Sequence, residues 1–95
     1  MSLKKKKKIQ LNLYITQKND KVEKMIEELK KVLKELEDEY ELEVVNISEN
    51  PEVAEKEKIL ATPTLEKKLP LPVRRIIGDL SDQEGVLAGL DLVSK

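Results

Sequence analysis

Hydrophobic and polar positions follow two different periods in the first half of the chain. Between Ile9 and Thr16 they alternate, which predicts a strand with one buried face. Asn19 or Asp20 then offers an N-cap, and apolar residues recur behind it at helical spacing. These apolar residues are Val22, Met25, Ile26, Leu29, Val32, Leu33 and Leu36. Alternation returns over residues 40–47, so the order strand, helix, strand predicts a right-handed βαβ unit with parallel strands.

Prolines divide the second half of the chain into shorter pieces. Asn50 followed by Pro51 predicts the start of a short helix, because proline is favoured at the first helical position. After Pro63, two β-prone segments at 64–68 and 73–77 are separated by two further prolines. We expect these two segments to form a hairpin.

The last segment has an ambiguous pattern. Ser81 and Glu84 have the spacing of a capping box, and the apolar residues up to Val93 then fit a helix. The same segment also alternates as in a strand, at Val86, Ala88, Leu90 and Leu92. Gly85 and Gly89 each weaken a helix by up to roughly 1 kcal/mol. We predict a C-terminal helix, so the complete order is β, α, β, α, β, β, α.

Length and charge limit the domain organisation and the partners. The 95 residues predict one α/β domain at 9–95 after a basic flexible leader at 1–8. Lys and Arg total 18 against 19 Asp and Glu, so there is no overall field that attracts nucleic acid. We expect the leader to be solvated, although its run of lysines also fits a handle for nucleic acid or anionic lipid. No apolar run approaches the roughly 20 residues of a membrane span, so we expect a cytoplasmic protein without nucleic-acid or membrane partners.

The available side chains offer little catalytic chemistry. The sequence contains no Cys and no His. This excludes a thiol nucleophile, a disulfide and a thiolate metal site, and it removes the usual general base at neutral pH. Neither of the common glycine-rich phosphate-binding motifs occurs. We therefore expect a protein-binding domain with no catalytic residues, metal or cofactor, and not an enzyme.

Several segments resemble known families. The element order, with Pro63 opening the third strand, is similar to the thioredoxin-like fold, but the turn at 17–20 reads Gln-Lys-Asn-Asp and lacks its Cys pair. More specific are the segments Lys58-Ile-Leu-Ala-Thr-Pro-Thr-Leu65, Leu69-Pro-Leu-Pro-Val-Arg-Arg-Ile-Ile-Gly-Asp-Leu-Ser81 and Gly89-Leu-Asp-Leu92. These segments strongly resemble the KaiB family of circadian clock proteins. With Leu13-Tyr14-Ile15 and Asn50-Pro51, the resemblance extends over nearly the whole chain.

The resemblance implies a function and a choice between two folds. KaiB-like proteins bind a KaiC-type ATPase ring and regulate its phosphorylation cycle, and a KaiA-like protein is a second candidate partner. They are metamorphic: a thioredoxin-like βαβαββα monomer binds KaiC, whereas a resting βαββααβ fold self-associates, often as a tetramer. The folds differ in the C-terminal half, where this sequence is ambiguous, so fold switching is a hypothesis. Ala88 and Ser94 stand where larger apolar residues are common in the family, which leaves less apolar surface for the resting assembly, so we expect the thioredoxin-like form. Two alternatives stay open, a KaiC-binding sensor domain of a clock histidine kinase and an engineered KaiB variant held in one fold.

The resemblance also marks candidate partner-binding residues. Lys58, Arg74 and Arg75 are the basic residues of the matched segments and are candidates for contact with an acidic KaiC surface. The alternative is an ordinary charged strand face. Arg74 and Arg75 point to opposite faces of a regular strand, so both cannot serve one flat interface equally.

Four further residues are candidates for structural or fold-switching roles. Pro63 follows Thr at a strand start, which suits a cis peptide bond. We expect Gly78 and Gly89 to supply conformational freedom, and Asp91 to act as a cap or a polar surface residue.

The sequence also departs from the family in its first half. Glu23 stands where a basic residue is common, and Glu41 and Glu43 stand where Ala and Lys are common. These departures put partner contacts at those positions in doubt.

Overall fold

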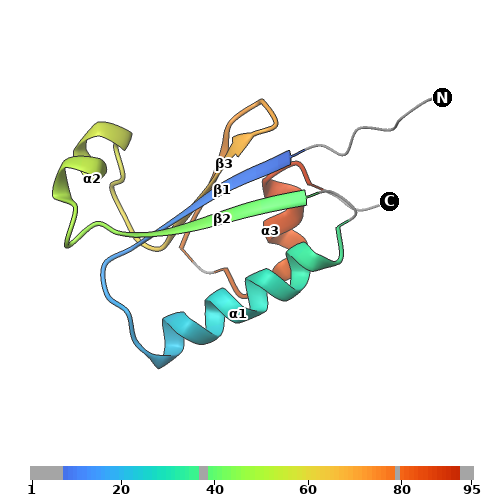
Figure 1. Ribbon diagram of the computed structural model, residues 1–95, viewed down its shortest axis with the longest axis horizontal. Helices are drawn as coiled ribbons and strands as arrows, with labels where there is room; N and C mark the ends of the chain where they lie inside the picture. Colours follow the sequence, from blue (N-terminus) through green and yellow to red (C-terminus); the bar gives the residue numbers. More distant parts are fainter. Residues whose placement is uncertain (1–7, 37–38, 79, 93–95) are drawn as a thin grey trace.

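The computed structural model describes residues 8–36, 39–78 and 80–92, so most of the expected leader and the end of the expected last helix lie outside the described residues. The predicted order of elements is confirmed (Figure 1). The elements are β1 (Lys8–Ile15), α1 (Asp20–Lys34), β2 (Glu39–Asn46), α2 (Pro51–Glu57), β3 (Thr64–Leu69), β4 (Arg74–Ile77) and α3 (Gln83–Gly89).

The four strands form one mixed sheet in the order β2-β1-β3-β4. β1 and β2 run parallel, as the βαβ prediction requires, whereas β3 runs antiparallel to β1 and β4 antiparallel to β3. The predicted hairpin is therefore present. β2 and β4 are the two edges of the sheet.

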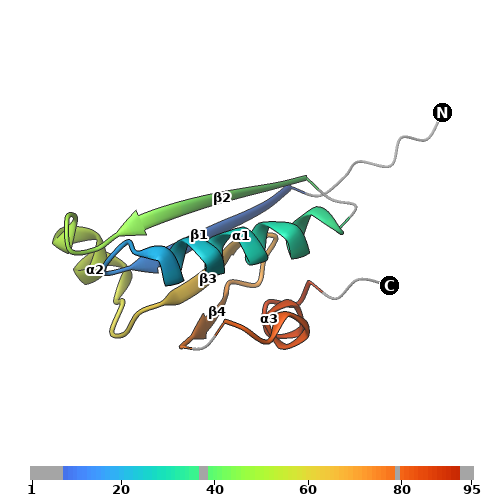
Figure 2. The ribbon, with the colours of Figure 1, turned by 90° about the horizontal axis from the view of Figure 1, so that it is seen from below.

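Helices α1 and α3 lie on the same face of the sheet, which we call the helix-covered face (Figure 2). Alternate β1 residues point into this face, because successive strand residues point to opposite sides. The apolar stripes of both helices pack on them. The resulting core consists of Ile9, Leu11, Leu13, Ile15, Ile26, Leu29, Leu33, Leu65, Leu80, Val86, Leu90 and Leu92. We call the opposite side of the sheet the outer face.

The ends of α1 follow from its sequence. Asn19 is the N-cap, and its side-chain oxygen accepts a hydrogen bond of 2.9 Å from the backbone N–H of Val22. Asp20 and Glu23 lie in the first turn and Lys31 and Lys34 in the last turn, which is the favourable arrangement for the helix dipole. The sequence therefore specifies both the position and the direction of this helix.

The prediction for the last helix was partly wrong. Asp82, and not Ser81, is the N-cap, because its side chain accepts a hydrogen bond of 3.1 Å from Gly85 N–H. The helix ends at Gly89 and does not continue to residue 93, whose placement lies outside the described residues. Asp91 has a left-handed backbone with φ of 63°, which helical residues do not adopt, and it follows the C-cap directly.

The two glycines among the candidate residues have different roles. Gly78 has φ of 100°, so it needs the freedom that only glycine provides. Gly89 has no such backbone, and a Cβ there would lie 3.0 Å from Cδ1 of Ile76. Glycine at position 89 therefore permits the close approach of α3 to β4, which corrects the expectation of conformational freedom. The Thr62–Pro63 peptide bond is cis.

Candidate functional site

The sequence candidate Lys58 lies where α2 ends. It has a left-handed backbone, with φ of 58° and ψ of 50°, and its N–H bonds back to the last turn of the helix. The N–H of Ile59 then donates to the Ala54 carbonyl at 2.8 Å. Ile59 is buried, whereas Leu60 is 94% exposed. We call residues 58–61 the Lys58 loop. It carries one exposed cation, Lys58, and two positions later one exposed large apolar side chain, Leu60.

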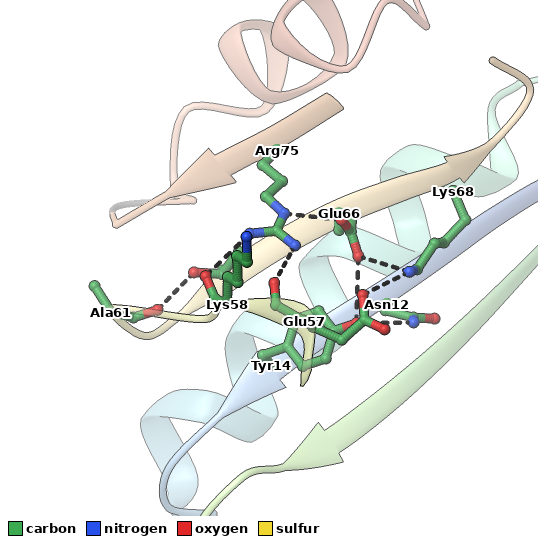
Figure 3. Close-up of polar contacts among 9 residues, drawn as sticks. Asn12, Tyr14, Glu57, Lys58, Ala61, Glu66, Lys68 and Arg75 are labelled. Carbon is green, nitrogen blue, oxygen red and sulfur yellow. Dashed lines mark hydrogen bonds and ion pairs between the residues drawn. The ribbon is translucent and has the colours of Figure 1, made fainter. Parts of the chain in front are cut away.

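A buried carboxylate on β3 organises the charges beneath this loop (Figure 3). Glu66 is only 2% exposed although it lies on the outer face. Its Oε2 accepts a hydrogen bond of 2.8 Å from Arg75 Nε, and its Oε1 lies 3.4 Å from Lys68 Nζ. Lys68 Nζ also donates to Glu57 Oε1 at 2.8 Å. We call Glu57, Glu66, Lys68 and Arg75 the charged network.

The same network holds the C-terminal end of α2. The Arg75 guanidinium donates from Nη1 to the Lys58 carbonyl at 3.2 Å and from Nη2 to the Glu57 carbonyl. These carbonyls end a helix, where the backbone has no partner of its own and carries partial negative charge. None of the seven residues of α2 is buried. The polar contacts of Arg75 and Lys68 therefore contribute much of what holds this helix on the sheet.

A buried tyrosine extends the network towards β1. The Tyr14 hydroxyl donates to Glu66 Oε1 at 3.3 Å and accepts from Asn12 Nδ2 at 3.1 Å. Burial is the main cause that raises the pKa of Tyr14 above its ordinary value of 10.0. The hydroxyl therefore stays protonated at neutral pH and serves Glu66 as a donor.

The ion pair between Glu57 and Lys68 shifts the pKa of both residues. The hydrogen bond from Lys68 lowers the pKa of Glu57 below its ordinary value of 4.5. The same bond raises the pKa of Lys68 above 10.5. Each charge therefore stabilises the other, and both groups are ionised throughout the neutral range.

The structure brings together only part of the predicted partner-binding set. Lys58 and Arg75 meet at the end of α2, where the Arg75 side chain is engaged with backbone and carboxylate oxygens. Arg74 pairs in register with Lys67 and points to the helix-covered side, so the two arginines face opposite ways, as predicted. Gly89 and Asp91 belong to the α3 end of the molecule.

Pro63 lies at a different place, in the wall of an open pocket between the end of β1, the start of α1 and the segment that precedes β3. Gln17, Asn19 and Lys21 also line this pocket. It occupies the turn in which the sequence comparison found no Cys pair, so it has no thiol. Within the described ranges, no group of three Asp or Glu residues is placed to hold a metal ion. No helix in that same part of the chain is long and apolar enough to cross a membrane.

Sequence reasoning missed Glu57, Glu66 and Lys68. One signal was available: Glu66 and Lys68 have the two-residue spacing that places both on one face of a strand. The cross-strand pairing of Glu66 with Arg75 depends on the hairpin register, however, and the contact with Glu57 depends on where α2 is placed. The sequence gives neither of these positions.

Comparison with known proteins places this geometry in a family. The model of the KaiB domain matches residues 12–92. The chain belongs to the KaiB family. The circadian clock oscillator protein KaiB of Synechococcus elongatus is 52% identical over 84 residues, which cover 87% of this chain and 82% of that protein. The protein of the same name from Trichodesmium erythraeum is 49% identical over 89 residues, covering 93% and 86% of the two chains.

Solved structures confirm the thioredoxin-like arrangement of this KaiB-family chain. The solution structure of the N-terminal domain of Synechococcus elongatus SasA superposes with a TM-score of 0.73, covering 100% of this chain and 92% of that one, at 22% identity. The crystal structure of a designed protein superposes with a TM-score of 0.67, covering 92% and 78%, at 24% identity. At these identities the likeness concerns the fold alone. The family itself is established by the KaiB matches.

Proposed function

We propose that this chain is a non-enzymatic clock component that binds a KaiC-type ATPase ring through the Lys58 loop and regulates the ring's phosphorylation cycle. The observation that carries the proposal is the exposed pair of Lys58 and Leu60 at the end of a helix whose position is fixed. An exposed cation beside an exposed apolar side chain suits a partner surface that combines acidic and apolar groups. Membership of the KaiB family supports the choice of partner.

The proposal assigns the partner contact to one of the three basic candidates. Lys58 and Arg75 are both exposed, but the guanidinium of Arg75 is hydrogen-bonded within the chain to Glu66 and to the Glu57 carbonyl. Arg74 is exposed but lies on the other side of the sheet. An interface centred on the Lys58 loop therefore includes Lys58 and excludes Arg74.

Fold switching stays a prediction that bears on affinity. If only the thioredoxin-like form binds the ring, the measured affinity falls in proportion to the fraction of molecules in that form. A self-associating resting form would lower that fraction as concentration rises. Light scattering over a range of concentrations, with exchange peaks in NMR spectra, tests this expectation; a single monomeric conformer under all conditions would count against it.

The test of the proposed function is co-elution of the chain with a KaiC-type hexamer and ATP in size-exclusion chromatography with light scattering. Lys58→Asn is the informative variant, because Asn tolerates the left-handed backbone while the long cationic side chain is removed. We expect it to weaken binding about tenfold or more, in the range of an interface residue that matters. Lys56→Gln is the matched control, since Lys56 is exposed in the last turn of α2. Equal binding by both variants and the parent would refute the proposal.

A further inference from the structure

Glu66 is an unusual residue for its position. A carboxylate that is 98% removed from solvent is costly unless charge and hydrogen bonds compensate it. Here Arg75 and Lys68 supply two cations and Tyr14 supplies a neutral donor. All three point at one side chain on the outer face of β3, so Glu66 is the centre on which the charged network converges.

The geometry of Arg75 links this centre to the Lys58 loop. Its planar guanidinium uses Nε on Glu66, Nη1 on the Lys58 carbonyl and Nη2 on the Glu57 carbonyl. Because these donors share one rigid plane, fixing Nε on Glu66 also fixes the direction of the other two. The position of Glu66 on β3 therefore determines, through Arg75, where the end of α2 is held.

The end of α2 needs this support. The helix has seven residues, which is too short to be stable through its own hydrogen bonds. Lys58 adopts a backbone conformation that is strained for a residue with a side chain. The second contact that holds α2, from Lys68 to Glu57, also depends on Glu66. Lys68 Nζ lies within 3.4 Å of Glu66 Oε1, so Glu66 helps to orient the ammonium group towards Glu57.

We propose that Glu66 is a positioning residue for partner binding: by orienting Arg75 and Lys68 it fixes the end of α2 and so presents Lys58 to the partner, while Arg75 itself makes no partner contact. This inference rests on the proposed function, because it takes Lys58 to be the residue that contacts the partner. It reassigns Arg75 from a contact residue to an internal support.

Amide hydrogen exchange measured by NMR on the free chain tests the support. The N–H of Ile59 reports the end of α2, because it bonds to Ala54 across that end, and the N–H of Leu33 in α1 reports the domain as a whole. Glu66→Gln keeps the shape of the side chain and removes the charge. We expect the protection of Ile59 to fall about tenfold or more with that of Leu33 unchanged. No change at Ile59, or an equal fall at both amides, would overturn the inference whatever the partner does.

Two arginine variants separate support from contact. Arg75→Lys keeps the charge but loses the planar fork, so it should reproduce both the loss of protection at Ile59 and a weaker binding to the ATPase ring. Arg74→Lys is the matched control on the neighbouring residue and should change neither. Weaker binding by Arg75→Lys with full protection at Ile59 would mean that Arg75 contacts the partner, which overturns the inference. Full binding by Lys58→Asn would instead refute the proposed function, and the exchange result on Glu66→Gln would still stand.

Discussion

The two faces of the sheet are held together by different forces. On the helix-covered face, α1 and α3 bury aliphatic side chains against β1 and β3. The hydrophobic effect that drives this burial has no preferred direction and requires only close packing. On the outer face, α2 buries none of its residues, and charged contacts of defined geometry hold its end. One face therefore provides the stability of the domain, whereas the other positions an exposed loop.

The outer face is the part of the molecule that is able to change without unfolding the domain. Burial of apolar surface contributes about 25 cal/mol per Å², so loss of the helix-covered face means loss of the fold. The contacts of α2 are polar, and those of Glu57 and Lys68 are partly exposed, so this helix can open locally at a lower free energy than the core. A binding loop attached to such a helix therefore depends on the charged network to keep its position.

The largest effect should come from the helix-covered face. Leu33 is fully buried, so Leu33→Ala should lower the free energy of unfolding by about 2–5 kcal/mol, through lost burial and the cavity that is left. Urea denaturation measures it. Lys30→Ala, on the exposed side of the same helix, should change stability by less than about 0.5 kcal/mol. Similar losses for the two variants would contradict the division between the faces.

A smaller effect should come from the start of α1. Asn19→Ala removes the acceptor for Val22 N–H and should cost about 1 kcal/mol of global stability, because α1 belongs to the cooperative core. Asn19→Asp retains an acceptor and should stay close to the parent. Thermal unfolding followed by circular dichroism compares the two. A loss confined to local exchange near residue 19 would mean that α1 frays independently of the core.

The smallest effect should be the pH dependence of the outer face. The pKa of Glu57 is lowered in the folded state, so its contribution is complete above its ordinary value of 4.5 and is lost as pH falls through the lower folded value. The pKa of Lys68 is raised, so its contribution is complete below 10.5 and is lost as pH rises through the higher folded value. The pair therefore holds α2 at every pH between the folded pKa of Glu57 and the folded pKa of Lys68.

The ¹³C chemical shift of the Glu57 carboxyl carbon measures the acid limb. We expect its midpoint below 4.5 in the parent chain and a return towards 4.5 in Lys68→Met, which removes the hydrogen bond that is the largest cause of the shift. A midpoint at or above 4.5 in the parent would show that the pair is not formed in solution.

Much of the fold was predictable because the period of the apolar residues differs between its elements. The alternation in β1 and the stripe of α1 each agree with the sheet and helix that form, and Asn19 caps the helix as its residue type suggests. The last helix was predicted less well. Ser81 and Asp82 are both good capping residues, and the structure shows that Asp82 is the one that accepts from Gly85 N–H.

The candidate site was predictable only in part. Lys58 was found because it lies in a segment that resembles a family, and its exposure agrees with a contact role. Arg75 belonged to the same segment, but its side chain is occupied by Glu66 and by two helix carbonyls. The identity of a charged residue gives its chemistry, whereas its availability depends on neighbours that are 9 to 18 positions away in the chain.

Local periodicity and composition are enough to specify the order of elements, the parallel β1–β2 pair, the apolar face of α1 and the absence of thiol and imidazole chemistry. The burial of Glu66, the support of a helix end by Arg75 and the approach of α3 to Ile76 at Gly89 are visible only in the folded chain. These contacts join residues that are distant along the chain. Hydrogen-bond geometry and close packing between β3, β4, α2 and α3 exist only after those segments have been brought together.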